Sequence, residues 1–528
     1  MEDTAVPSYN LASLLEDSAA KYPERTAIVL GDTRLTYAQV NGAANQVANL
    51  LVSRGIQPGD KIALISPNLP YFTIIYNGIL KAGGVVVPLN VLLKSREFAY
   101  HYADADVKAV FAFQGTPELA IGAEAFEAFQ ETDSVKDFFL VTVDPAAPSP
   151  IEGAETFGAA VAGAGGSPVF ETVETDEDDT VVILYTSGTT GQPKGAELRH
   201  RNLRDNALAG KDLFGADAER PDTFLAVLPL FHTFGQTVIQ NGAAAFGGTV
   251  VMLPRFEAPA AIAMLLREKV TFFAGVPTMY WGLLGALDET VDVAEIAKNL
   301  RVAAAGGSAL PVEIHHEFEK RFGVTIQEGY GLSETSPVAA FSLAGKPVRA
   351  GSIGEAIPGV ELKLIDPASW EEITWTPEAI GEIAIKGHNV FKGYYGRPEA
   401  TAEVLTEDGW FRTGDLARRD EDGWYYIVDR AKEMIIRGGF NVYPREIEEV
   451  LLTHPAISLA AVIGVPHESH GEEVKAVVVL KPGATATPEE IVAWSKENMA
   501  GYKYPRIVEI TAALPMTATG KILKRELK

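Results

Sequence analysis

The 528-residue sequence contains no cysteine. Disulfides, zinc–thiolate sites, iron–sulfur clusters and a cysteine nucleophile are therefore excluded, so any thiol chemistry needs a thiol from a second substrate. Basic residues are also scarce, because 45 Lys and Arg stand against 70 Asp and Glu and leave a net charge of −25. A surface of this sign repels phosphate backbones, and we do not expect nucleic acid as a partner.

The sequence also lacks a recognisable targeting signal and a long apolar run. Its first residues are acidic, whereas a signal peptide needs a basic start and an apolar core. The most apolar stretch, 72–93, is interrupted by Asn, Lys, Gly and Pro, and it falls short of the ~20 apolar residues of a spanning helix. We expect a soluble, cytoplasmic protein. Peripheral contact with a membrane, and the choice between monomer and homodimer, are left open.

The chain length predicts several structural units, at roughly 100–200 residues per domain. Short apolar runs alternate with helical patterns at 61–65, 84–88 and 109–112, and again at 223–228, 249–253, 271–274 and 301–305. This alternation is typical of a parallel sheet covered by helices on both faces. The segment 114–180 is rich in Ala, Gly, Pro, Asp and Glu, and we interpret it as a variable surface region.

The pattern changes in the last third of the chain. Short alternating strands with Gly, Pro and Trp turns predict a small β-rich, barrel-like unit at about 350–430. Helix and strand patterns after it predict a compact α+β module. The predicted fold is therefore α/β: a large N-terminal domain of 1–431, made of doubly wound α/β subdomains and the β-rich unit, and a small C-terminal domain of 432–528.

The strongest chemical signal is a loop of Gly, Ser and Thr that follows an apolar run at 181–185. It is not a P-loop, which needs Gly, four residues and then Gly-Lys-Ser/Thr. Glycines let backbone N–H groups close around an anion, hydroxyl groups add donors, and lysine adds charge. The segment therefore predicts a phosphate site with the candidate residues Thr186, Ser187, Gly188, Thr189, Thr190 and Lys194.

This loop resembles the signature of the adenylate-forming superfamily, which includes acyl-CoA synthetases, firefly-luciferase-like enzymes and peptide-synthetase adenylation domains. Further motifs resemble those of the family and follow in its order: Gly-Tyr-Gly-Leu-Ser-Glu-Thr at 329–335, Gly-Trp-Phe-Arg-Thr-Gly-Asp at 409–415, Asp-Arg-Ala-Lys-Glu at 429–433, Arg-Gly-Gly-Phe-Asn-Val-Tyr-Pro at 437–444 and Pro-Met-Thr-Ala-Thr-Gly-Lys at 515–521. The resemblance covers nearly the whole chain. It implies an AMP-forming acid–thiol ligase that uses ATP, Mg²⁺ and coenzyme A.

The resemblance also implies roles in forming an acyl-AMP. Glu334 and Thr186 would hold Mg²⁺, which prefers oxygen ligands. Ser333, where the family more often has Thr, would reach the α-phosphate. Tyr330 would lie against adenine. The other implied nucleotide contacts are Gly307, Ser308, Ala309, Glu328, Gly329, Gly331, Asp415 (to the ribose), Ile427, Arg430 and Lys521, and the implied catalytic residues are Lys521, Glu334, His232 and Lys194.

The second step, thiol transfer, is implied to use a different arrangement. In the family the C-terminal domain is mobile and rotates about a residue two positions after the motif Arg, which is Lys432 here. The rotation would bring a loop to the pantetheine tunnel, where glycines allow close approach to a narrow ligand. The implied coenzyme A contacts are Arg437, Gly438, Gly439 and Phe440.

The identity of the acid depends on the segment around His232. Relatives that activate amino acids typically place an Asp there to pair with the ammonium group, and this sequence has none. The resemblance makes His232 a positioning or gating residue beside an apolar pocket that also includes Phe231, Phe234, Gly235, Val276, Pro277 and Val338. The segment is most similar to bacterial fatty-acyl-CoA ligases. We expect a medium- or long-chain fatty acid, with an aryl acid such as a cinnamate as the alternative.

Other functions compete with that of a CoA ligase. An acyl-AMP ligase that loads a carrier protein is a further alternative, although the acidic surface speaks weakly against an acidic carrier. A non-catalytic nucleotide-binding protein would have no chemical need for Lys194, Glu334, Asp415, Arg430 and Lys521 together. A dehydrogenase is discarded, because no Gly-x-Gly-x-x-Gly follows an early strand.

Overall fold

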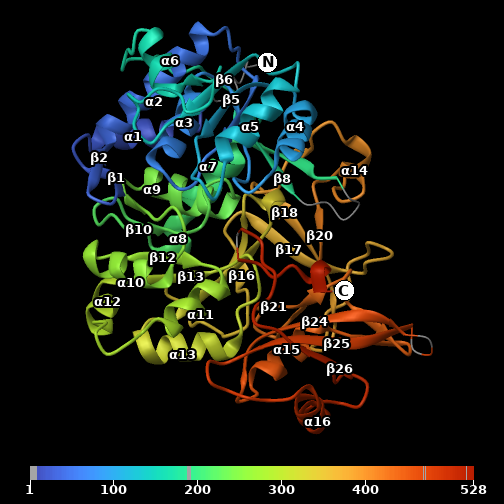
Figure 1. Ribbon diagram of the computed structural model, residues 1–528. Coiled ribbons are helices and arrows are strands. Elements are labelled where there is room, and N and C mark those ends of the chain that lie inside the picture. The colour runs from blue at the N-terminus through green and yellow to red at the C-terminus, as the bar shows by residue number, and fades with distance from the viewer. Residues whose placement is uncertain (1–8, 187–191, 468, 470, 519, 528) are drawn as a thin grey trace.

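The computed structural model describes residues 9–186, 192–467, 469, 471–518 and 520–527 (Figure 1). An eight-stranded sheet carries the first part of the chain, and its central strands are parallel. Its order is β19 (Gly393–Tyr394), β9 (Lys194–Arg199), β8 (Thr180–Thr186), β4 (Val85–Pro88), β3 (Lys61–Ile65), β5 (Val107–Phe113), β6 (Asp137–Val141) and β7 (Glu155–Thr156).

Helices cover this sheet and bury its inner strands from solvent. The buried residues Ile62, Ala63 and Leu64 of β3 form an unbroken apolar run, as expected for a parallel strand covered on both faces. The helices of this part are α1 (Ser13–Lys21), α2 (Tyr37–Ser53), α3 (Pro70–Lys81), α4 (Ser95–Asp104), α5 (Ile121–Gln130) and α6 (Phe157–Gly163).

A nine-stranded sheet forms the second half of the N-terminal region, and it is parallel from β1 to β14 and antiparallel at both ends. Its order is β16 (Glu355–Ala356), β15 (Val338–Phe341), β14 (Ile326–Gly331), β13 (Val302–Ala305), β12 (Phe272–Gly275), β10 (Thr223–Ala226), β11 (Thr249–Met252), β1 (Thr26–Leu30) and β2 (Thr33–Thr36). The parallel strands end at one edge, the usual place for a ligand site.

The helices that accompany the nine-stranded sheet include one unusual element. The segment η1 (Phe234–Asn241) is a π-helix, a form often found at functional sites. The other helices are α7 (His200–Leu208), α8 (Gly210–Phe214), α9 (Gly242–Ala245), α10 (Ala258–Arg267), α11 (Pro277–Gly285), α12 (Val293–Asn299), α13 (Val312–Phe322) and the short 3₁₀ turn η2 (Ser333–Thr335).

A small β-rich unit follows in the chain, while β16 and β19, which lie within the predicted range 350–430, belong to the two large sheets. It is a four-stranded antiparallel sheet of β17 (Val360–Ile365), β18 (Gly381–Gly387), β20 (Phe411–Arg419) and β21 (Tyr425–Arg430). The short helix α14 (Pro398–Ala402) lies in the chain between β19 and β20.

The C-terminal part has its own sheet and its own apolar core. In Figure 1 it lies, orange to red, at the lower right, beside the yellow-green helices of the nine-stranded sheet. Ile435, Val462 and Ile491 belong to a core cluster separate from that of the N-terminal region. Its elements are β22 (Ile435–Arg437), β23 (Phe440–Val442), α15 (Pro444–Leu452), β24 (Ile457–His467), β25 (Gly471–Leu480), α16 (Pro488–Asn498), β26 (Ile507–Ile510) and η3 (Lys524–Leu527).

The predicted fold class is confirmed: a large α/β N-terminal domain with mixed sheets and a small α+β C-terminal domain. The division at 431/432 stays a prediction. The segment 114–180 is more regular than its composition indicated, because the buried run Phe138–Val141 lets β6 join the eight-stranded sheet. Among the described residues, no helix is long and apolar enough to cross a membrane.

Candidate active site

Two antiparallel strands, β8 and β9, flank the predicted phosphate loop along the chain. Thr186, at the end of β8, pairs with Lys194, the first residue of β9. The ammonium nitrogen of Lys194 lies 5.2 Å from the centroid of the Tyr394 ring, within range of a cation–π contact. The predicted residues Ser187, Gly188, Thr189 and Thr190 fall outside the residues that the structure describes.

Glu334 is a buried carboxylate in the η2 turn, next to β9. The Tyr394 hydroxyl donates a hydrogen bond to Glu334 Oε1 at 2.9 Å. Within the described ranges, no Lys or Arg side chain forms an ion pair with it, and burial raises the pKa of Glu334 above its usual value. A buried carboxylate in this condition fits a hard cation such as Mg²⁺, which would compensate its charge.

Asp415 is the centre of a second polar group. It lies on β20 opposite Arg430 on β21. The Arg430 Nε donates to Asp415 Oδ1 at 2.7 Å, and the Tyr330 hydroxyl donates to Asp415 Oδ2 at 2.6 Å. The attraction to Asp415 raises the pKa of Arg430, so the guanidinium stays charged. The structure thus joins three residues that the sequence predicted as nucleotide contacts.

The remaining predicted nucleotide contacts lie around these two groups. A Cβ at Gly331 would lie 1.7 Å from the Pro337 carbonyl oxygen, so only glycine fits this approach between β14 and β15. Gly329 and Ser333 lie on either side of this glycine along the chain, in β14 and η2. Other predicted contacts are exposed in the turn after β13 (Gly307, Ser308 and Ala309) or lie on β21 (Ile427).

Glu328 precedes the glycine-rich end of β14. Its side chain is buried, and Gly351 N donates to its Oε1 at 3.0 Å. Burial raises the pKa of Glu328 to about 7, and Arg445 opposes that shift. Arg445 belongs to α15, so this glutamate lies near the C-terminal domain.

His232 is hydrogen-bonded to Phe234 of the predicted acyl pocket and lies within range of the charge of Lys521. Phe234 N donates to His232 Nδ1 at 3.3 Å, so in the neutral ring the proton is on Nε2. Burial lowers the pKa of His232 to about 4, and the nearby Lys521 lowers it further in the same direction. The imidazole is therefore neutral near pH 7.

The predicted acyl residues meet the predicted adenine segment. A Cβ built on Gly306 would lie 3.1 Å from Phe234 Cε1, and one on Gly307 would lie 3.5 Å from Val276 Cγ1. These contacts place the two sets side by side. The other predicted acyl residues are also buried: Phe231, Gly235, Pro277 and Val338.

The C-terminal lysine loop contacts the N-terminal domain. Thr278 Oγ1 donates to the Gly520 carbonyl at 3.2 Å, and a Cβ on Gly520 would come within 2.8 Å of the same Thr278 oxygen. Lys521 is solvent-exposed, yet the surrounding protein desolvates its amine and lowers its pKa, with Arg430 adding to the effect. The charge of Lys521 acts on His232, and the charges of Arg430 and Asp415 act on Lys521, so the lysine loop approaches these groups.

The predicted coenzyme A residues do not join this group. Gly438 and Gly439 form the turn between β22 and β23, with φ of 58° and 84°. Phe440 is 57% exposed and stacks on Tyr502 with ring centroids 4.8 Å apart. The fourth predicted residue, Arg437, pairs with Glu473, at 2.6 Å. The predicted hinge, Lys432, is exposed in a turn between β21 and β22.

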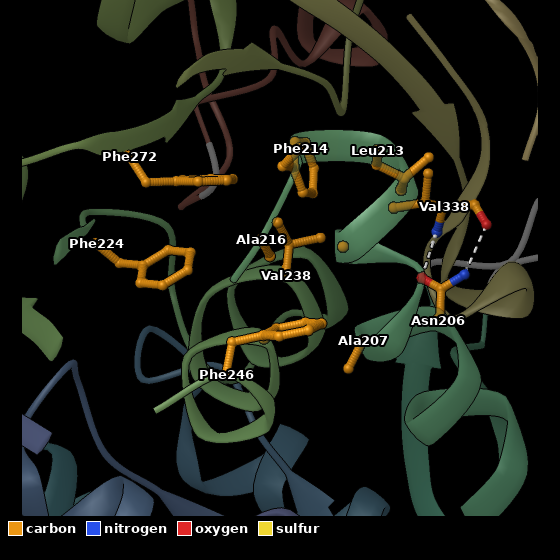
Figure 2. Close-up of a pocket in the computed structure, with 12 residues that line it drawn as sticks. Asn206, Ala207, Leu213, Phe214, Ala216, Phe224, Val238, Phe246, Phe272 and Val338 are labelled. Atoms are coloured by element: carbon orange, nitrogen blue, oxygen red, sulfur yellow. Dashed lines mark hydrogen bonds between the residues drawn. The ribbon is translucent and has the colours of Figure 1, made fainter. Parts of the chain in front are cut away.

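The structure also shows an apolar cavity that the sequence did not predict (Figure 2). Val338 is shared with the predicted acyl pocket. The cavity is narrow, with about 10 Å³ open to the centre of a water molecule. Its lining comes from three helices, η1 and sheet strands: Asn206, Ala207, Gly210, Leu213, Phe214, Ala216, Phe224, Val238, Gly242, Phe246, Phe272 and Val338.

Aromatic rings form one wall of this cavity, as Figure 2 shows. Phe272 lies 4.8 Å from Phe214 and 4.6 Å from Phe224 between ring centroids. The polar group of the lining is already used, because the Asn206 amide exchanges two hydrogen bonds with the Val338 backbone, at 2.8 and 3.0 Å. The cavity therefore offers an apolar environment.

Comparison with known proteins agrees with these features. The model of the AMP-binding enzyme family matches residues 15–395, and that of the AMP-binding enzyme C-terminal domain matches residues 446–521. The chain belongs to the AMP-binding enzyme family. The predicted membership of the adenylate-forming superfamily, close to fatty-acyl-CoA ligases, is thereby confirmed.

The names of similar proteins indicate the activity of this AMP-binding enzyme. A long-chain-fatty-acid–CoA ligase of Bacillus subtilis (strain 168) is 37% identical over 99% of this chain and 94% of the relative. A feruloyl-CoA synthase of Amycolatopsis sp. is 36% identical over 96% of each. The crystal structure of ATP-bound MatB from Rhodopseudomonas palustris is 34% identical, with a TM-score of 0.87 over 99% of this chain and 98% of that one. The protein is an AMP-forming acid–CoA ligase, as predicted.

Proposed function

We propose that this ligase activates a medium- or long-chain fatty acid as acyl-AMP and transfers the acyl group to coenzyme A. The observation that supports this choice is the apolar cavity, which shares Val338 with the predicted acyl pocket. Each methylene moved from water into such a space contributes ~0.8 kcal/mol. With the Asn206 amide bound to Val338, the lining offers an alkyl chain apolar contacts.

The cavity is too narrow to accept an alkyl chain unless it widens. An alkyl chain needs more space than about 10 Å³, so lining side chains must move when the acid binds. Val238 lies in η1, and Phe246 directly follows α9. Rotation of these two side chains would open the cavity without moving the sheet. Chain-length preference then depends on how far these side chains give way.

An aryl acid such as a cinnamate is the second candidate. Phe214, Phe224 and Phe272 form a wall of mutually packed rings, and flat aromatic substrates stack well on such surfaces. The relative named feruloyl-CoA synthase supports the same alternative.

For the first step, we assign the substrate carboxylate a place beside His232, where it attacks the α-phosphate of ATP. Pyrophosphate leaves and acyl-AMP forms, while charge develops on both phosphate groups. Lys521 and Lys194 supply positive charge to the α-phosphate and to the leaving group respectively. Asp415 holds the ribose, and Arg430 keeps that carboxylate oriented.

Glu334, with Thr186, is proposed to hold Mg²⁺. The metal would neutralise phosphate charge and orient the oxygens for in-line displacement. The Tyr330 hydroxyl is hydrogen-bonded to Asp415, and its aromatic ring is proposed to lie against the adenine of ATP. The neutral His232 fits a positioning role, because it adds no charge next to Lys521.

The thiol step is proposed to follow a rotation about Lys432. Gly438, Gly439 and Phe440 would then face the acyl-AMP, and the thiol of coenzyme A would attack its carbonyl and release AMP. A pantetheine arm on a carrier protein is the alternative acceptor, since it offers the same thiol.

The proposal is tested by supplying ATP, Mg²⁺ and coenzyme A with a ladder of acids from acetate to stearate, plus cinnamate, and identifying products by mass. Acyl-CoA, AMP and pyrophosphate formed best from the longer acids support the proposal. Preference for cinnamate would select the aryl alternative. Acyl-AMP without acyl-CoA would indicate a carrier-protein acceptor.

A further inference from the structure

We infer that Tyr394 is a positioning residue that orients the metal-binding carboxylate of Glu334 and aligns Lys194 of the phosphate loop. No motif in the sequence drew attention to it. Its hydroxyl donates to Glu334 Oε1 at 2.9 Å, and its ring faces the Lys194 ammonium at 5.2 Å from the centroid. One side chain thus contacts both groups that are proposed to act on the β- and γ-phosphates.

The backbone around Tyr394 ties the same two elements together. Residues 391–395, here called the strap, link η2 to β9, the strand that follows the phosphate loop. Phe391 N donates to the Glu334 carbonyl at 2.9 Å, and Tyr395 N donates to the Gly195 carbonyl at 2.8 Å. Tyr394 pairs with Ala196 across β19 and β9. The strap therefore fixes where the phenol stands relative to both partners.

The chemistry of the contact fits orientation rather than catalysis. An ionised carboxylate has about four lone-pair positions, so one hydrogen bond at Oε1 fixes its rotation and leaves positions for a cation. Partners of this kind around metal ligands commonly tune affinity by 10–100-fold. The ring contact with Lys194 holds the ammonium without neutralising it, because an aromatic face attracts a cation but carries no charge.

The inference rests on the proposed role of Glu334, and the experiment separates the two. Mn²⁺ binding to the full-length enzyme with ATP, in the absence of acid, is measured by electron paramagnetic resonance. Tyr394→Phe should weaken Mn²⁺ binding about tenfold. Glu334→Gln should weaken it at least as much. Tyr395→Phe, the same change one residue along the strap, is the matched control and should leave binding unchanged.

Coupling between the residues gives a sharper readout. In a Glu334→Gln background, Tyr394→Phe should cause little further loss, because the hydroxyl acts through that carboxylate. In EDTA, Tyr394→Phe should keep its ATP affinity, since the ring remains against Lys194. Tyr394→Leu should lose roughly three- to tenfold in the same assay. Thermal unfolding of each variant shows that it is folded.

The outcomes distinguish the two ideas. Unchanged Mn²⁺ binding in Tyr394→Phe, beside a clear loss in Glu334→Gln, would overturn the role of Tyr394 and spare that of Glu334. Unchanged binding in Glu334→Gln would overturn both. Equal losses in Tyr394→Phe and Tyr395→Phe would show a general effect on the strap and would also overturn the inference.

Discussion

Two parts of the C-terminal domain differ in where they lie. The Lys521 loop contacts the N-terminal domain through the bond from Thr278 to the Gly520 carbonyl. The turn at Gly438 and Gly439 instead stays with its own domain, and Phe440 beside it is exposed. One small domain therefore brings the Lys521 loop into contact with the N-terminal domain and keeps the predicted coenzyme A loop within its own domain.

This difference has a simple chemical meaning. A lysine is needed where phosphate charge develops, whereas a thiol needs an open path to the acyl carbonyl. The two requirements conflict at one position, so a domain whose two loops serve as proposed would have to present them in turn. The arrangement described here matches the requirements of the first step.

The largest expected effect comes from removing the amine of Lys521, whose loop contacts the N-terminal domain. Lys521→Ala should slow acyl-AMP formation about 10²–10³-fold, because a charge at the α-phosphate is lost. It should spare thioester formation from supplied acyl-AMP. ATP–pyrophosphate exchange measures the first step, and acyl-CoA formation from synthetic acyl-AMP measures the second. Equal losses in both would contradict the division of labour.

The next variant tests whether the other loop must move. Lys432→Pro fixes φ near −65° at the proposed hinge. We expect a severalfold loss in the thiol step and a smaller change in ATP–pyrophosphate exchange. Lys432→Ala, which keeps backbone freedom, serves as the control. Undiminished transfer to coenzyme A in the proline variant would rule out this hinge.

The apolar cavity, which lies in the N-terminal domain, provides a third test. Gly242 lines the cavity, and a Cβ there would approach only the Thr237 carbonyl oxygen, at 3.5 Å. Gly242→Ala should fit the backbone, take up space in the cavity and reduce kcat/KM for long acids severalfold relative to short ones. Gly285→Ala, on an exposed part of α11, is the matched control. An unchanged chain-length profile would remove the cavity from the acyl site.

The smallest expected effect is on pH dependence. The pKa of Lys521 lies below the ordinary lysine value, so its ammonium loses its proton at a lower pH than a free lysine does. Acyl-AMP formation should therefore decline as the pH rises toward that value. Lys521→Arg keeps its charge and should move the alkaline decline to higher pH. The rate of ATP–pyrophosphate exchange from pH 7 to 10 measures both, and identical profiles would exclude Lys521 as the titrating group.

The sequence predicted much of the nucleotide side. Alternating strands and helices are local patterns, and the motif at 329–335 keeps Tyr330 and Glu334 close together at the end of β14, while their roles in the site stay predictions. The Tyr330–Asp415 bond joins residues 85 positions apart, and only the family resemblance indicated that they belong to one site.

The cavity and the strap were missed for physical reasons. Phe214, Phe224 and Phe272 lie on α8, β10 and β12, and a buried phenylalanine has the same sequence pattern whether it packs a core or lines a cavity. Tyr394 lies on a two-residue strand whose pairing with β9 spans almost two hundred residues. Local periodicity carries no information about such a contact.

Asp415 already has a hydrogen bond to each of its carboxylate oxygens, from Tyr330 and Arg430. Each carboxylate oxygen can accept a second hydrogen bond, so the ribose hydroxyls could be added, if Asp415 holds the sugar as proposed, without displacing Tyr330 or Arg430. A sugar that lacks one of these hydroxyls would make one bond fewer to a carboxylate that the two protein donors already orient. The resting hydrogen bonds would therefore favour ribonucleotides over deoxyribonucleotides.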